Sequence, residues 1–169
     1  HAEVYPNNKA LSTDLGGGSI LDVGCYPISM ARLIAGVDLG KEYAEPLEVY
    51  GVGHIGELSH IDELSICCLK FSRGILAQVA TGVYVVQENV VRIFGSEGDI
   101  FIPSPWVPGG REPGITKIFV RKRCDNIVRE VITETKIGLY SIEADMVAAS
   151  INIRQSPVMK WEDSLGNMR

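Results

Sequence analysis

The chain has 169 residues, of which 46% are hydrophobic and 22% charged, and its formal net charge is -5 at pH 7. This length and composition are those of an ordinary globular domain with a full hydrophobic core. The negative charge gives no electrostatic reason to expect nucleic acid or anionic lipid as a partner. The sequence shows no apolar stretch of the about 18 residues that a membrane span needs.

The four cysteines predict neither a disulfide framework nor a metal site. No two of them have Cys-x-x-Cys spacing, and the adjacent Cys67 and Cys68 would face opposite sides of a strand. His54 and His60 lie near an irregular strand end, a spacing that provides no fixed ligand geometry. We therefore expect reduced thiols, no bound metal and a cytoplasmic location.

The first helix is predicted over residues 19–35, after a polar, loop-like stretch over residues 1–15. Because Pro27 has no N–H to donate to the preceding turn, we expect a kink or a break near Tyr26. Gly36 is suited to the C-terminal cap of this helix.

Most of the remaining chain is predicted as β-structure, with tight hairpin turns at 72–74 and 96–98. A long loop is expected over 103–114 and a second helix over 141–153. The predicted strands cover residues 47–55, 63–71, 75–86, 89–94, 99–102, 116–122 and 127–134.

The fold class predicted from these elements is α+β. Both alternating faces of the strand at 75–86 are apolar, which is unusual for an antiparallel sheet with one face in water. We therefore expect an open, largely antiparallel sheet of six to seven strands with helices on one face. The other face would be available for dimerisation.

One motif has the spacing of a dinucleotide-binding loop. Residues 51–56 read Gly-x-Gly-x-x-Gly, but the sequence continues into a strand, and the residue about 20 positions on is Phe71, not an acid. A dinucleotide loop requires a helix after the glycines and an acid for the ribose. We therefore interpret the match as a chance occurrence within a β-strand.

The strongest functional pattern lies at the start of the first helix. Gly16, Gly17 and Gly18 precede a helical stretch in which Asp22 and Tyr26 are four residues apart. Residues at this spacing share a helix face, so a carboxylate and a phenol could both reach one substrate hydroxyl. Spacing alone leaves open the alternative of a core helix in which Tyr26 packs and Asp22 caps or forms a salt bridge.

Residues 16–27 resemble the Gly-Gly-Gly-x-Leu-x-Asp-x-Gly-x-Tyr/His motif of the glucose–fructose oxidoreductase / inositol dehydrogenase (Gfo/Idh/MocA) family. Stretches at 71–74, 92–98 and 157–169 are also similar to the family, in the same order, so the resemblance covers nearly the whole chain. The tyrosine variant of the motif resembles the branch that contains dihydrodiol dehydrogenase and xylose dehydrogenases.

The resemblance implies a two-domain parent oxidoreductase whose N-terminal Rossmann domain binds NAD or NADP. Residues 1–169 match only its C-terminal substrate-binding and dimerisation domain. We therefore expect the chain to be a piece of a longer protein, with no cofactor-binding residues of its own. The expected substrate is a sugar, polyol or dihydrodiol, and the expected protein partner is a second copy across the sheet face.

The same resemblance implies roles for the residues at the helix start. Tyr26 would be the general acid/base, Asp22 would orient the substrate hydroxyl, and Gly16, Gly17 and Gly18 would form a substrate loop. The family's Glu-Lys-Pro lysine, which would favour the phenolate, is absent from this sequence, so the isolated fragment is expected to be inactive. The alternative is a non-catalytic ligand-sensing or dimerisation module of the same fold.

Overall fold

The computed structural model describes residues 8–125 and 127–169, so part of the loop predicted over 1–15 lies outside the described residues. The chain divides into two compact units. The first contains the described residues up to Gln87 together with Met159–Arg169, and the second is Glu88–Val158. Both units contain antiparallel strands and helices, so the predicted α+β class is confirmed.

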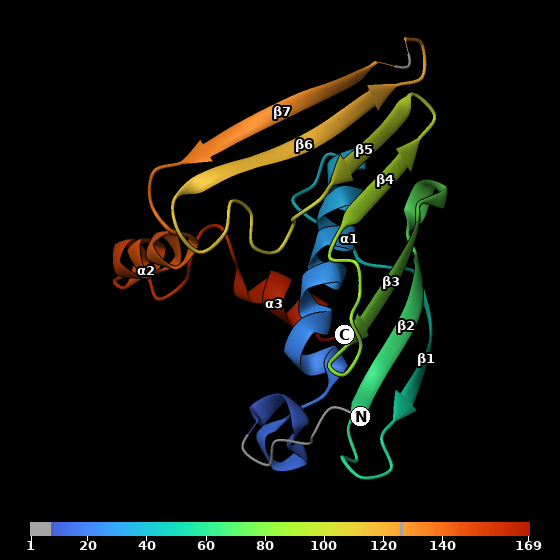
Figure 1. Cartoon of the computed structure of the whole chain (residues 1–169), viewed down its shortest axis with the longest axis vertical. Helices are drawn as coiled ribbons and strands as arrows, with labels where there is room; N and C mark the ends of the chain where they lie inside the picture. Colours follow the sequence, from blue (N-terminus) through green and yellow to red (C-terminus); the bar gives the residue numbers. More distant parts are fainter. Residues whose placement is uncertain (1–7, 126) are drawn as a thin grey trace. The chain divides into compact units, whose positions relative to one another are not determined.

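Within the described residues, seven strands form a sheet of three and a sheet of four, and not one continuous open sheet (Figure 1). The sequence predicts apolar strands over residues 75–86 and 89–94, with almost no gap between them. In the structure the chain bends at residues 83–85, and the side chain of Val85 lies against Gly82, where the third strand ends. The bend ends the regular alternation there, although the residues themselves are apolar.

The three-stranded sheet has the order β1-β2-β3 and is antiparallel throughout. Its strands are β1 (Glu48–Ile55), β2 (Asp62–Lys70) and β3 (Leu76–Gly82), close to the predicted ranges. The hairpin predicted at residues 72–74 joins β2 to β3 as a single 3-10 turn. Arg73 and Gly74 both have positive φ in this turn, 61° and 78°, which reverses the chain tightly.

The helix of the first unit is interrupted where Pro27 predicts a break. A π-helical turn, Ile20–Gly24, leads into α1 (Cys25–Asp38), so the change of winding lies next to Tyr26. Pro27 is the third residue of α1 and has no N–H to donate to the carbonyl of Val23 in the preceding turn. Two short 3-10 turns, Lys9–Leu11 and Thr13–Leu15, precede this helix.

The prediction that Gly36 caps this helix is wrong. Gly40 is the left-handed residue, with φ 67°, and the N–H of Lys41 donates to the carbonyl of Gly36 at 2.9 Å. The N–H of Gly40 donates to Val37, which completes a Schellman motif. Gly36 is instead a buried residue inside the helix, and only glycine fits there, since a Cβ would lie 2.4 Å from the Cα of Tyr43.

The core of the first unit lies between α1 and one face of the three-stranded sheet (Figure 1). Cys67 contributes to this face and Cys68 is exposed, as their adjacent positions in a strand predict. Burial, together with the charge of Cys68, raises the pKa of the Cys67 thiol. The buried members of this core are Ala31, Ala35, Ala44, Leu69 and Phe71.

One expectation about membranes needs correction. The helical run Thr13–Asp38 is long and apolar enough, by length and composition alone, to cross a membrane. The core helix of a soluble protein meets the same criterion, so the observation is weak evidence for a span. The buried face of this run contacts the sheet through Ala31 and Ala35, and it includes a buried, ion-paired Arg32.

The second unit is a four-stranded antiparallel sheet of order β4-β5-β6-β7, followed by one helix. The hairpin predicted at residues 96–98 joins its first two strands, and residues 103–113 form the predicted long loop. On one face the rings of Phe101 and Phe119 stack with centroids 6.0 Å apart. The elements are β4 (Val91–Gly95), β5 (Gly98–Ile102), β6 (Gly114–Lys122), β7 (Val128–Thr135) and α2 (Leu139–Ser150).

A third helix, α3 (Trp161–Asn167), is not predicted from the sequence. It belongs to the first unit and contacts α1. Its seven residues are too few for a stable helix on their own, so its formation depends on tertiary contacts.

Candidate functional site

The three glycines before the helix approach other parts of the same chain. Gly16 and Gly18 have positive φ, 70° and 122°. A Cβ on Gly17 would lie 2.7 Å from the carbonyl oxygen of Ala10, and a Cβ on Gly18 would lie 2.0 Å from Oδ1 of Asp62. The glycines therefore make room for the Ala10 backbone and the Asp62 carboxylate. Their contact with a substrate stays a prediction.

The carboxylate of Asp62 holds the first turn of the helix. Its Oδ2 accepts hydrogen bonds from the N–H of Ile20 at 2.7 Å and from the hydroxyl of Ser19 at 2.8 Å. Ser19 is fully buried, and the hydroxyl of Thr81 donates to its Oγ at 3.2 Å. The helix start is thus tied to both β2 and β3.

Asp22 and Tyr26 lie just beyond this anchor, one in the π-helical turn and the other at the second position of α1. The Asp22 side chain is 31% exposed and Tyr26 is 51% exposed, whereas Gly24, between them, is buried near Thr81. Nζ of Lys9 lies 4.0 Å from Oδ1 of Asp22, a distance at which an exposed pair contributes little. A carboxylate and a phenol are therefore presented to solvent from a helix turn whose other side is fixed to the sheet.

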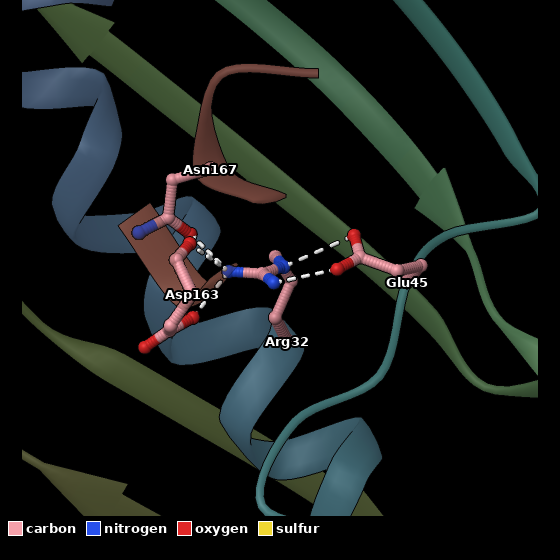
Figure 2. Close-up of polar contacts among 4 residues, drawn as sticks. All are labelled: Arg32, Glu45, Asp163 and Asn167. Atoms are coloured by element: carbon pink, nitrogen blue, oxygen red, sulfur yellow. Dashed lines mark hydrogen bonds and ion pairs between the residues drawn. The ribbon is translucent and has the colours of Figure 1, made fainter. Parts of the chain in front are cut away.

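A second polar cluster surrounds Arg32, which is fully buried in the middle of α1 (Figure 2). On one side its guanidinium donates to both carboxylate oxygens of Glu45, at 2.7 and 3.3 Å. On the other side it donates to the carboxylate and carbonyl of Asp163 and to Oδ1 of Asn167, and its plane lies over the ring of Tyr43. Burial alone would lower the pKa of Arg32, but its hydrogen bonds to Glu45 and Asp163 outweigh this effect and raise that pKa.

The Arg32 cluster joins α1 to the C-terminal helix. Because α3 supplies Asp163 and Asn167, it completes the coordination of the buried cation. A Cβ on Gly166 would lie 2.0 Å from Nη2 of Arg32, so the helix backbone comes very close to the guanidinium. Outside this cluster, Lys160 forms an exposed ion pair with Glu42, whose hydrogen bond raises the pKa of Lys160.

Sequence reasoning missed both Asp62 and Arg32. A signal for Arg32 existed: it is a lone cation among the apolar residues of the buried helix face, and such a residue needs carboxylate partners. Nothing local marks Asp62, since its partners in the helix are more than 40 residues away in sequence.

The glycine-rich stretches of the described residues do not form a nucleotide-phosphate loop. Gly51 and Gly53 lie within β1 and pair with β2, as the chance-match interpretation predicts. The glycines at 16–18 precede a helix, as the glycines of a phosphate-binding loop do. However, the N–H of Ile20 at this helix start already donates a hydrogen bond to the carboxylate of Asp62. A second anion at this helix start would be repelled.

Residues 1–101 match the model of the GFO/IDH/MocA C-terminal domain. The chain belongs to the GFO/IDH/MocA family. The resemblance found in the glycine, aspartate and tyrosine motif is thereby confirmed.

Several of the curated relatives are named as dehydrogenases. The chain is 26% identical to the trans-1,2-dihydrobenzene-1,2-diol dehydrogenase of Xenopus tropicalis, over 96% of this chain and 47% of that protein. It is 23% identical to the D-xylose 1-dehydrogenase (NADP(+)) 2 of Haloferax volcanii, over 94% of this chain and 45% of that protein.

A solved structure has the same fold. The 3-ketoreductase KijD10 from Actinomadura kijaniata, in complex with NADP and TDP-benzene, superposes with a TM-score of 0.77 at 20% identity, over 97% of this chain and 47% of that chain. The chain thus spans about half the length of the curated relatives it matches.

Proposed function

We propose that this chain is the substrate-binding part of an NAD(P)-dependent oxidoreductase that acts on a hydroxyl of a sugar, polyol or dihydrodiol. The observation that carries the proposal is the pair of exposed groups, Asp22 and Tyr26, on a helix start whose opposite side is fixed to the sheet by Ser19 and Asp62. Family membership supports oxidoreductase chemistry, and the names of the relatives support this class of substrate.

In this proposal Tyr26 exchanges a proton with the reacting oxygen of the substrate. During oxidation its phenolate would take the hydroxyl proton, and during reduction its phenol would return a proton to the carbonyl oxygen. Asp22 would accept a hydrogen bond from a substrate hydroxyl and so orient it. An ordinary phenol has a pKa of about 10, so efficient proton uptake at neutral pH requires a cation next to Tyr26 in the complete protein.

The nicotinamide cofactor does not fit the residues described in this chain. Neither glycine-rich stretch forms the strand–turn–helix loop that holds a pyrophosphate, and the N–H of Ile20 is already bonded to Asp62. We therefore place the NAD or NADP site in another part of the full-length protein.

Calorimetric titration of NAD+ and NADP+ tests this division of labour. Residues 1–169 should release no binding heat at cofactor concentrations up to about 1 mM. A Kd of about 1 mM corresponds to roughly -4 kcal/mol of binding free energy. The full-length protein should bind one of the two cofactors. Circular dichroism of the fragment serves as the control for folding, and saturable binding by a folded fragment would overturn the proposed location.

We also propose a homodimer through the open face of the three-stranded sheet. Val52, Ile66 and Ala80 lie in register across this face, on the side opposite α1. Val52 is 73% exposed and Leu76, on the same face, is 74% exposed. Such a continuous apolar row on a sheet is typical of a surface that is covered by a partner.

Sedimentation velocity of the full-length protein tests the dimer. The wild type should sediment as a dimer at micromolar concentration, and Ile66→Glu should shift it to monomer because two charges would face each other across the symmetric contact. The matched control Val128→Glu adds the same charge to an exposed strand residue of the other sheet. A wild type that is monomeric at every concentration would rule out the proposal.

A further inference from the structure

We propose that Asp62 is a positioning residue for the reaction, acting through the helix turn that presents Asp22 and Tyr26. This inference rests on the proposed function. Asp62 does not lie on the helix and belongs to the first position of β2, so it acts on the helix from outside.

The argument starts from the hydrogen bonds of the Asp62 carboxylate. A single oxygen, Oδ2, accepts from two consecutive residues of the helix start, the hydroxyl of Ser19 and the N–H of Ile20, at 2.8 and 2.7 Å. Charge-assisted hydrogen bonds of this length are about twice as strong as neutral ones. A negative group at a helix N-terminus is also favoured by the helix dipole. Together these interactions fix the rotation of the first turn about the helix axis.

The position of this turn determines where the two reactive groups lie. Asp22 is two residues beyond Ile20 within the π-helical turn, and Tyr26 is the second residue after that turn. Single π-helical turns are rare and are often found at functional sites. A rotation of the turn would therefore displace the phenol and the carboxylate together. Misplacement of a catalytic group by about 1 Å can lower a rate by about 100-fold.

The place of Asp62 is itself specified by the sheet. The pairing of β1 with β2 shifts its register between His54 and Ile55, and Ile55 is the partner of Asp62. A β-bulge of this kind redirects a side chain, and bulges are frequent next to active sites. Gly18 lacks the Cβ that would collide with Oδ1 of Asp62, so the loop leaves room for this carboxylate.

The test compares Asp62→Asn with the neighbouring Glu63→Gln in the full-length protein. Glu63 accepts a hydrogen bond from Ser59 and does not touch the helix in the contacts the structure describes, so it is a matched control. The assay follows the formation of NADH or NADPH, with whichever cofactor the full-length protein binds, from D-xylose and from trans-1,2-dihydrobenzene-1,2-diol. We expect Asp62→Asn to lower kcat by about 10- to 100-fold, with the KM for the cofactor unchanged, and Glu63→Gln to change neither.

A readout independent of activity separates this inference from the proposed function. In hydrogen–deuterium exchange, Asp62→Asn should lose protection at residues 19–26, while Glu63→Gln should keep it. If the wild type turns over neither substrate, the result contradicts the proposed function, and hydrogen–deuterium exchange alone then tests the positioning role. Protection at residues 19–26 that survives Asp62→Asn would still overturn the positioning role. Lost protection with an unchanged kcat would also overturn it.

Gly18→Ala leaves Asp62 in the chain and provides a second variant in case Asp62→Asn does not fold, and a double-mutant cycle with Asp62→Ala refines it. Gly18→Ala should displace the Asp62 carboxylate and lower kcat in the wild-type background. In the Asp62→Ala background the colliding oxygen is absent, while the backbone cost of alanine at φ 122° is the same. The effect of Gly18→Ala on kcat should therefore be several-fold smaller in that background. Additive effects would contradict the inference.

Discussion

Replacing Tyr26 by phenylalanine is expected to lower the kcat of the full-length protein by about 10²- to 10⁴-fold, the usual contribution of a general acid/base. The substitution removes only the hydroxyl, and Tyr26 is half exposed, so the ring and the helix start should be unaffected. The KM for the cofactor should not change, because we place the cofactor site in another part of the protein. Steady-state rates with D-xylose and with trans-1,2-dihydrobenzene-1,2-diol measure the effect.

The matched control is Tyr50→Phe, which removes a hydroxyl from another exposed tyrosine of the same unit. Its hydroxyl donates to Glu48 on the surface of β1, at 3.0 Å. This variant should keep the wild-type kcat. An unchanged rate for Tyr26→Phe would remove Tyr26 from the mechanism. The non-catalytic module would then become the better description of this chain.

Replacing Arg32 by methionine is expected to lower the free energy of unfolding by about 2–4 kcal/mol. Methionine keeps much of the apolar stem but leaves Glu45 and Asp163 without their shared cation. Glu45 is half exposed and can regain water, so the loss is placed slightly below the roughly 3–5 kcal/mol of a fully enclosed pair. For a protein of this size, the melting temperature should fall by about 5–15 °C, measured by calorimetry.

The C-terminal helix should be the first element affected by this substitution. It is short, and its contacts with Arg32 come from Asp163 and Asn167, so limited proteolysis should cleave after residue 158 in Arg32→Met but not in the wild type. Arg32→Lys should restore the stability only in part, since an ammonium cannot bind both carboxylates through a planar fork.

Lys160→Met is the control for the Arg32 experiment. It removes the exposed pair of Lys160, just before α3, with Glu42, in the loop after α1, and should leave the melting temperature almost unchanged. The folded pKa of Arg32 is raised, so its stabilising effect is complete at every pH below the ordinary arginine pKa. The loss in Arg32→Met should therefore not vary with pH across the neutral range. Equal melting temperatures for Arg32→Met and the wild type would show that the cluster does not hold α3.

The sequence alone determined the features that depend on neighbours along the chain. In the part of the chain that the structure describes, periodicity and turn residues predict the seven strands, two of the three α-helices and the turns at 72–74 and 96–98. The break next to Tyr26 follows from the missing N–H of Pro27. The motif that contains Asp22 and Tyr26 was sufficient to place the chain in its family.

Only the tertiary structure decided which distant groups meet. A buried charge such as Arg32 needs partners in any fold. Its partner Asp163 is 131 residues away in sequence, and the two meet only because α3 packs against α1. The same holds for Asp62, which reaches the helix start from β2, and for Gly18, whose close neighbour proved to be that carboxylate. Local patterns specify conformation and residue type, whereas hydrogen bonds between remote segments depend on a topology that no local pattern contains.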